Sequence, residues 1–334
     1  MHRRNFLSNS IAGSMAAAQQ PPAPRERASG GGGSNSYQVD VTVERRVQGK
    51  PHKGKMLAAI QPHCDDIPIY AGGTVLKLID EGYEGILITA SDDSMAGNLN
   101  PNLAQTRRGD ATYGQIVLAN ERDTQEMSRR LGLKEAVFLN YPNHNMDAWP
   151  IVEMRARLIF LFRAYKIDTI LVYDPSGLYE RNPDHYILAR AAESAFWMSK
   201  SEWDYPEHFK VGMTPHGPRE AYYFARGPQL VNRAVDIGDF IDRKVYANMA
   251  NVTQGPAGTR GAALRRRLAA EGKKLALLGN TDEEANRAYT KYFALEHDRV
   301  RGRGHGLDYA ELFHYVGPDS SSEEEYVKAN AEPL

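Results

Sequence analysis

Short apolar runs alternate with longer amphipathic segments along most of the chain. The runs predict β-strands, and the segments between them, in which apolar residues recur every three or four positions, predict helices. Strands are predicted at residues 56–61, 85–90, 136–141, 169–173, 221–224 and 233–237. Helices are predicted at residues 69–81, 110–131, 151–165, 183–199, 240–251, 262–278 and 283–295.

This order of elements predicts the fold class. Strands that are apolar nearly throughout and are each followed by a helix are typical of a parallel sheet with both faces covered. We therefore expect an α/β fold with a mostly parallel sheet, helices on both faces and a helical C-terminal elaboration. The folded part is expected to be a single domain over residues 37–318, followed by a polar tail at 319–334.

The N-terminal segment has the pattern of an export signal. Arg3 and Arg4 precede Phe-Leu, and a weakly apolar stretch then ends in alanines at residues 16–18. The segment 1–18 resembles a twin-arginine signal, which implies export to the periplasm or beyond. The alternative is an unstructured N-terminus that happens to contain two arginines. Residues 19–36 are rich in Pro, Gly and Ser and predict a flexible linker.

Composition excludes several classes of protein. Lys and Arg number 41 against 42 Asp and Glu, for a formal net charge of −1, whereas nucleic-acid binding usually needs a basic excess. The longest apolar runs fall far short of the roughly 20 residues that cross a bilayer, so no integral membrane segment is expected. The single cysteine, Cys64, excludes an internal disulfide and an all-cysteine zinc site.

Metal-binding residue types follow two of the predicted strands. His63, Asp65 and Asp66 come directly after the first strand, and Asp184 and His185 follow the fourth. In an open α/β sheet, ligands bind just beyond the carboxyl ends of the strands, so these two clusters are expected at one edge. Imidazole and carboxylate ligands suit zinc, and three protein ligands leave one position open for water, as in catalytic sites.

These residues resemble a known family. Pro62-His63-Cys64-Asp65-Asp66 resembles the Pro-His-x-Asp-Asp motif of the PIG-L/LmbE-like de-N-acetylases, and Asn182-Pro183-Asp184-His185 resembles their distal His-x-x-His element. The resemblance covers most of residues 55–316, including stretches at 86–93, 130–132, 141–144 and 305–313. It implies a Rossmann-like fold, a zinc ion and removal of the acetyl group from an N-acetylglucosamine-type sugar.

The resemblance also implies roles for individual residues. His63, Asp66 and His185 would bind the metal, taken as Zn²⁺ with other divalent metals left open. Asp65 would be the general base that takes a proton from zinc-bound water as this water attacks the amide carbonyl. Of two adjacent carboxylates, one would be held ionised by the cation while the other is free to titrate.

Two positions depart from the family pattern. Ile67 replaces a glutamate, and Asn182 replaces the first histidine of the distal element, which helps polarise the carbonyl or protonate the leaving group. Asn182 before Pro183 is also typical of a helix N-cap, so its role is either capping or catalytic. If it caps, another side chain must supply the catalytic help, and the candidates are His144 and then His305.

Substrate-binding residues are less well marked. The resemblance and the neighbouring glycines point to Asp93, Asn143, His305 and one of Arg108 and Arg122. Ordinary surface roles for these residues remain open. Glu180 could either orient a ligand or cap nearby backbone.

The sequence therefore predicts a metal-dependent hydrolase that acts on an N-acetylated sugar or glycoconjugate. The alternative is a catalytically weakened sugar-binding protein that retains the metal cleft, as the changes at Ile67 and Asn182 suggest. A dinucleotide-binding oxidoreductase is disfavoured, because no Gly-x-Gly-x-x-Gly opens the first helix. Nothing in the sequence fixes the oligomeric state.

Overall fold

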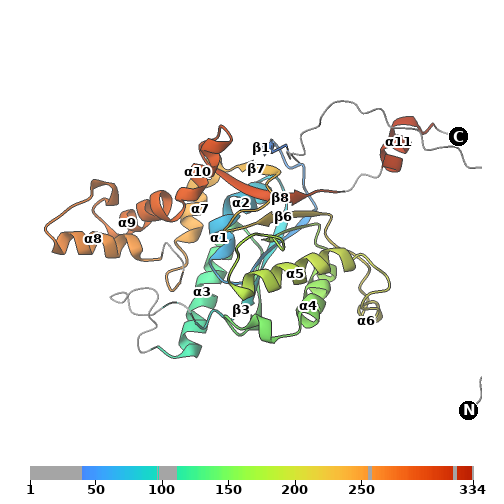
Figure 1. Cartoon of the computed structure of the whole chain (residues 1–334), viewed down its shortest axis with the longest axis horizontal. Coiled ribbons are helices and arrows are strands. Elements are labelled where there is room, and N and C mark those ends of the chain that lie inside the picture. The colour runs from blue at the N-terminus through green and yellow to red at the C-terminus, as the bar shows by residue number, and fades with distance from the viewer. Residues whose placement is uncertain (1–39, 96, 98–110, 255–257, 319–321, 333–334) are drawn as a thin grey trace, which may run out of the picture. The chain divides into compact units, whose positions relative to one another are not determined.

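The computed structural model describes residues 40–95, 97, 111–254, 258–318 and 322–332, and Figure 1 shows their arrangement. The predicted export signal and linker, residues 1–36, lie outside these described residues. The described residues all fall in one compact unit, and the single domain expected over residues 37–318 stays a prediction.

An eight-stranded sheet forms the centre of this unit, with strand order β1-β7-β8-β6-β5-β2-β3-β4. The strands are β1 (Thr42–Glu44), β2 (Met56–Gln61), β3 (Glu84–Ser91), β4 (Ala136–Tyr141), β5 (Thr169–Tyr173), β6 (Glu220–Phe224), β7 (Arg233–Asp236) and β8 (Ala310–Val316). Neighbouring strands are parallel, except that β8 runs antiparallel to both β6 and β7. The mostly parallel α/β fold is confirmed.

Helices cover both faces of the sheet because its strands are apolar on both sides. Alternate residues of β2 enter opposite cores: Leu57 and Ala59 on one face, Ala58 and Ile60 on the other. The first face is covered by α1 (Asp66–Tyr70), α2 (Gly72–Asp80), α3 (Tyr113–Leu131) and α7 (Ile241–Asn248). The second is covered by α4 (Ile151–Ala164) and α5 (Pro183–Met198).

The C-terminal part is largely helical, as expected. It contains α8 (Arg260–Ala270), α9 (Asp282–Tyr289), α10 (Glu296–Gly304) and α11 (Ser322–Asn330), and a short α6 (Glu207–Lys210) precedes β6. The predicted helix 262–278 was too long, because α8 ends just before Gly272, whose φ of +67° is left-handed. No helix among the described residues is both long enough and apolar enough to cross a membrane.

The predicted helix 69–81 is in fact divided in two at Ala71. The buried carboxylate of Glu311, on β8, accepts hydrogen bonds from the backbone N–H groups of Gly73 and Thr74 at 2.8 and 2.7 Å. It therefore supplies the N-terminal cap of α2 from a strand more than 200 residues further along the chain. The Nζ of buried Lys244 lies 2.7 Å from Glu311, so the carboxylate is also ion-paired.

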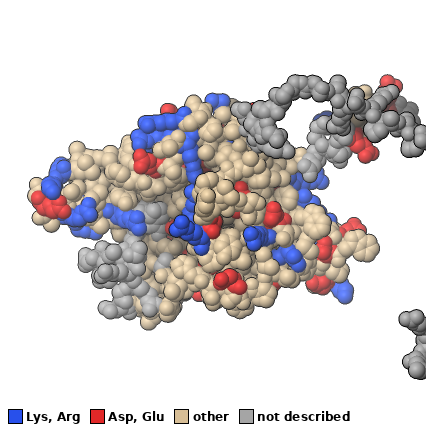
Figure 2. Space-filling model, viewed as in Figure 1, with Lys and Arg blue, Asp and Glu red and all other residues tan. Residues whose placement is uncertain are grey.

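Charged side chains of both signs are interspersed on the face of the molecule shown in Figure 2. This distribution agrees with the nearly balanced charge of the sequence.

Candidate metal centre

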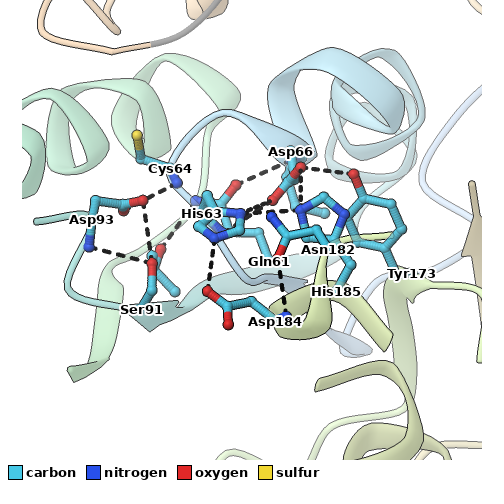
Figure 3. Close-up of polar contacts among 12 residues, drawn as sticks. Gln61, His63, Cys64, Asp66, Ser91, Asp93, Tyr173, Asn182, Asp184 and His185 are labelled. Carbon is cyan, nitrogen blue, oxygen red and sulfur yellow. Dashed lines mark hydrogen bonds and ion pairs between the residues drawn. The ribbon is translucent and has the colours of Figure 1, made fainter. Parts of the chain in front are cut away.

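The two predicted ligand clusters meet at the carboxyl edge of the sheet, as Figure 3 shows. His63 lies in the turn after β2, Asp66 begins α1, and His185 lies in the first turn of α5. Nδ1 of His63 is 3.1 Å from Nε2 of His185. The Asp66 carboxylate lies 3.4 Å from the first of these nitrogens and 3.7 Å from the second. Asp66 and His185, which are 119 positions apart in the chain, thus lie close together.

This arrangement fits a divalent cation. One ligand atom from each of His63, Asp66 and His185 can be chosen so that all three lie within 4.8 Å of one another. The three residues are only 5%, 4% and 2% exposed, so water contributes little to their solvation. Two imidazole nitrogens and a carboxylate are a donor set that zinc and similar borderline cations bind.

Each of these three residues is contacted by a further side chain. Oδ2 of Asp184 lies 3.0 Å from Nε2 of His63, and Oε2 of Glu180 lies 3.2 Å from Nδ1 of His185. The Tyr173 hydroxyl donates to Oδ1 of Asp66 at 2.7 Å. Its ring also stacks on His185, with ring centroids 4.2 Å apart. Such contacts fix the orientation of metal ligands and the tautomer of the histidines.

The adjacent carboxylates Asp65 and Asp66 have opposite electrostatic environments. Burial opposes ionisation of Asp66, but His185, His63 and the Tyr173 hydroxyl together hold its pKa well below the usual range. Burial, followed by the charge of Asp66, raises the pKa of Asp65 to about 6. One carboxylate is therefore suited to ligation and the other to proton transfer near neutral pH.

The two departures from the family pattern have clear structural consequences. Oδ1 of Asn182 accepts a hydrogen bond from the backbone N–H of Asp184 at 3.0 Å, and Pro183 follows in the first turn. Asn182 thus caps α5, which was one of its two predicted roles. Ile67 is fully buried in the core beneath the site, where it packs as an apolar side chain.

His144 lies next to the ligand cluster, in the loop that follows β4. Its ring centroid is 5.7 Å from that of His63, in an edge-on arrangement. The backbone is left-handed at φ +60°, and its N–H donates to Oδ2 of Asp184 at 2.7 Å, which holds the loop against α5. Partial desolvation, and then the positive charge of His63, lower the pKa of His144.

Asp93 turns out to be buried and engaged within the protein. Its carboxylate accepts hydrogen bonds from the backbone N–H of Cys64 at 3.1 Å and from the Ser91 hydroxyl at 3.2 Å. Burial raises its pKa to about 7. Asp93 therefore holds the turn that carries His63, a role that the sequence did not indicate, and direct contact with substrate stays a prediction.

The other predicted substrate residues lie in different surroundings. Asn143 is buried beside His144, and its Oδ1 accepts a hydrogen bond from the Met95 backbone, while its Nδ2 has no hydrogen-bond partner among the described residues. Arg122 is exposed on α3, and His305 follows the end of α10. In the described part of the chain, no hydrogen bond or ring contact joins either to the ligand cluster. Arg108 lies outside the described residues.

The sequence named the three candidate ligands and Glu180, but it did not predict the contacts of Asp184 with His63 or of Tyr173 with Asp66. Glu180 has one of the two roles that the sequence left open, since its Oε1 accepts a hydrogen bond from the backbone N–H of Asn182 at 2.9 Å. The contact of Tyr173 with Asp66 had one available indication, namely that a tyrosine ends the strand leading to the second cluster.

Comparison with known proteins agrees with this geometry. The sequence profile of the PIG-L family, described as GlcNAc-PI de-N-acetylase, matches residues 58–196. A diacetylchitobiose deacetylase of Thermococcus kodakarensis is 25% identical over 207 residues, which cover 60% of this chain and 71% of that protein. A 1D-myo-inositol 2-acetamido-2-deoxy-alpha-D-glucopyranoside deacetylase of a Mycobacterium species is 22% identical over 232 residues, 59% of this chain and 73% of that protein.

A solved structure shows the same fold. The N,N'-diacetylchitobiose deacetylase of Pyrococcus horikoshii superposes with a TM-score of 0.59 at 21% identity, covering 84% of this chain and 87% of that protein. The profile match begins in β2 and ends in α5, so it takes in both loops that carry the ligands. The segment 58–196, which carries His63, Asp66 and His185, is therefore similar to the PIG-L/LmbE-like family.

Proposed function

We propose that this chain is a metal-dependent hydrolase that removes the acetyl group from the amide nitrogen of an N-acetylglucosamine-type sugar or glycoconjugate. The observation that carries the proposal is the convergence of His63, Asp66 and His185 beside a second carboxylate, Asp65, whose pKa is raised to about 6. Two relatives named as deacetylases of N-acetylated sugars support the class of substrate.

His63, Asp66 and His185 would hold the cation, and their donor set suits Zn²⁺, with other divalent metals as alternatives. When bound, such a cation acts as a Lewis acid that lowers the pKa of water toward about 7 and polarises an acyl oxygen. Asp184, Glu180 and Tyr173 keep the three ligands in place.

Asp65 is the proposed general base. Its ionised carboxylate accepts a proton from the water that attacks the amide carbon, and the same carboxyl group then passes the proton to the departing amine nitrogen. A pKa of about 6 suits both steps near neutral pH, because the group readily gains and loses the proton.

His144 is the proposed electrophilic partner, in place of the family's distal histidine. Its ring carries an N–H that can donate to the acyl oxygen as negative charge develops there. Asn182 was the other catalytic candidate, but its side-chain oxygen is used in capping α5. Only its amide nitrogen is left for any contact with substrate.

Asn143 is the substrate-binding candidate that the structure supports best. Its Nδ2 is buried and has no partner among the described residues, and such a donor is costly unless a ligand or water accepts from it. A sugar hydroxyl or the acyl oxygen would satisfy it. Asp93, His305, Arg108 and Arg122 remain further candidates for binding the sugar.

The proposed location is the periplasm or the exterior, reached through the twin-arginine-type segment 1–18. This segment lies outside the described residues, so the proposal rests on the sequence pattern alone. Replacing Arg3 and Arg4 by lysine should keep a tagged chain inside the cell, and unchanged export would contradict the proposal.

The direct test is release of free amine from N-acetylglucosamine and diacetylchitobiose in the presence of zinc. The parent should turn over at least one of these compounds, and Asp65→Asn should lower kcat by about 100-fold or more at unchanged zinc content. Sugar binding by the parent without any turnover would instead favour the alternative, a sugar-binding protein that retains the metal cleft.

A further inference from the structure

Glu180 connects the metal centre to a second charged group. One of its carboxylate oxygens, Oε2, lies 3.2 Å from Nδ1 of His185, off the axis of an ideal hydrogen bond. The same oxygen accepts a hydrogen bond from Nε of Arg226 at 3.0 Å, and Nη2 of Arg226 contacts the other oxygen. Together with the backbone N–H of Asn182, the carboxylate therefore faces four donors.

These contacts hold Glu180 in one position. The paired contact with Arg226, which lies just beyond β6, is geometrically specific, since a planar guanidinium meets both oxygens of a carboxylate. The Asn182 backbone fixes the carboxylate to the N-terminus of α5, the helix that carries His185. The Glu180 side chain is only 11% exposed, so its charge is poorly screened by water.

We infer that Glu180, clamped by Arg226, is a positioning residue that sets the tautomer and orientation of His185 for metal binding. A proton on Nδ1 directed at the carboxylate leaves the lone pair of Nε2 free to face Asp66 and His63. The negative charge beside Nδ1 also makes the ring a better donor to a cation. This inference rests on the metal centre of the proposed function.

Glutamine at this position cannot replace the carboxylate. It keeps the size of Glu180 but offers one acceptor oxygen to the four donors that now share two. The –NH₂ group must then face a donor, either Arg226 or Nδ1 of His185. The ring is therefore expected to lose its fixed orientation while the backbone stays folded.

The test is the zinc affinity of the full chain, measured by competition with a chelator, for the parent, Glu180→Gln and Glu126→Gln. Glu126 makes a similar fork with Arg129 on the surface of α3, remote from the ligand cluster, so it is a matched control. We expect Glu180→Gln to bind zinc 10- to 100-fold more weakly, within the range found for such orienting residues. Glu126→Gln should stay within about twofold of the parent.

A second measurement separates positioning from loss of fold. The visible absorption spectrum of the cobalt(II)-substituted protein should change in Glu180→Gln, while the far-UV circular dichroism of the metal-free variant should match the parent. Zinc affinity within about twofold of the parent, with an unchanged cobalt spectrum, would overturn the inference and leave the proposed function intact. If the parent binds zinc but releases no amine, the proposed function fails, and the role of Glu180 is still decided by the affinities. A parent that binds no zinc would overturn both.

Discussion

At the residue scale, two neighbouring carboxylates of the candidate metal centre have different electrostatic environments. Asp65 and Asp66 are adjacent in sequence, but Asp66 accepts a hydrogen bond from the Tyr173 hydroxyl and lies within 3.7 Å of a ring nitrogen of each histidine. Asp65 is left with burial and a like charge beside it, which raise its pKa. The local motif predicts that both carboxylates lie at the site, but the difference between them comes from side chains on β5 and α5.

The role of His144 is tested by His144→Ala. We expect kcat to fall by about 100-fold, since loss of one donor to a developing oxyanion costs roughly 3 kcal/mol, while zinc content stays near that of the parent. Steady-state kinetics and metal analysis measure the two quantities on the same sample. His305→Ala, measured in parallel, should lower kcat less than His144→Ala does. A near-normal kcat in His144→Ala would contradict this assignment, and Asn182 or His305 would then be the candidate donor to the acyl oxygen.

The pH dependence of activity follows from Asp65. A base must be ionised, so kcat/KM should fall as the pH drops through the pKa of this group, which is raised to about 6 in the protein. A bound cation would lower that pKa by its positive charge, so the acid limb is expected at or below pH 6. Zinc content should be followed over the same range, because protonation of His63 or His185 would also release the ion. An acid limb well above pH 6 at constant zinc content would contradict the assignment.

At the scale of elements, long-range contacts decide where helices begin. Local periodicity predicts one helix over residues 69–81, but the carboxylate of Glu311 caps a second start at Gly72. Gly73 is needed there, because a Cβ would come within 2.7 Å of the Ile237 side chain. The sequence of the segment 69–81 does not predict this second helix start, because the capping residue lies on β8.

Glu311→Gln tests the importance of this cap. The substitution removes a buried charge that faces Lys244, so unfolding free energy should drop by about 3 kcal/mol. Urea denaturation near neutral pH measures the change. Glu84→Gln, which affects only an exposed contact with Lys134, should change stability by less than about 1 kcal/mol. A loss below about 1 kcal/mol for Glu311→Gln would show that the buried ion pair is not important for the fold.

At the scale of the whole molecule, the parallel sheet brings the chemistry together. β2 and β5 are neighbours, so the loops at their carboxyl ends meet although they are far apart in sequence. The order of apolar runs is a local property, which is why the strands β2 to β7 were predictable, and with them the convergence of His63, Asp66 and His185. Antiparallel β8 and the contact of Tyr173 with Asp66 were not, and the role of Glu180 was left open, because their placement depends on contacts between distant elements.

The central claim is that His63, Asp66 and His185 together hold one divalent cation. Anomalous diffraction at the zinc absorption edge, from crystals of the full chain grown with zinc, tests it most directly. We expect an anomalous peak in contact with Nδ1 of His63, Nε2 of His185 and the Asp66 carboxylate. Strong zinc peaks elsewhere with none between these three side chains, or His185 turned away from the other two, would contradict the claim.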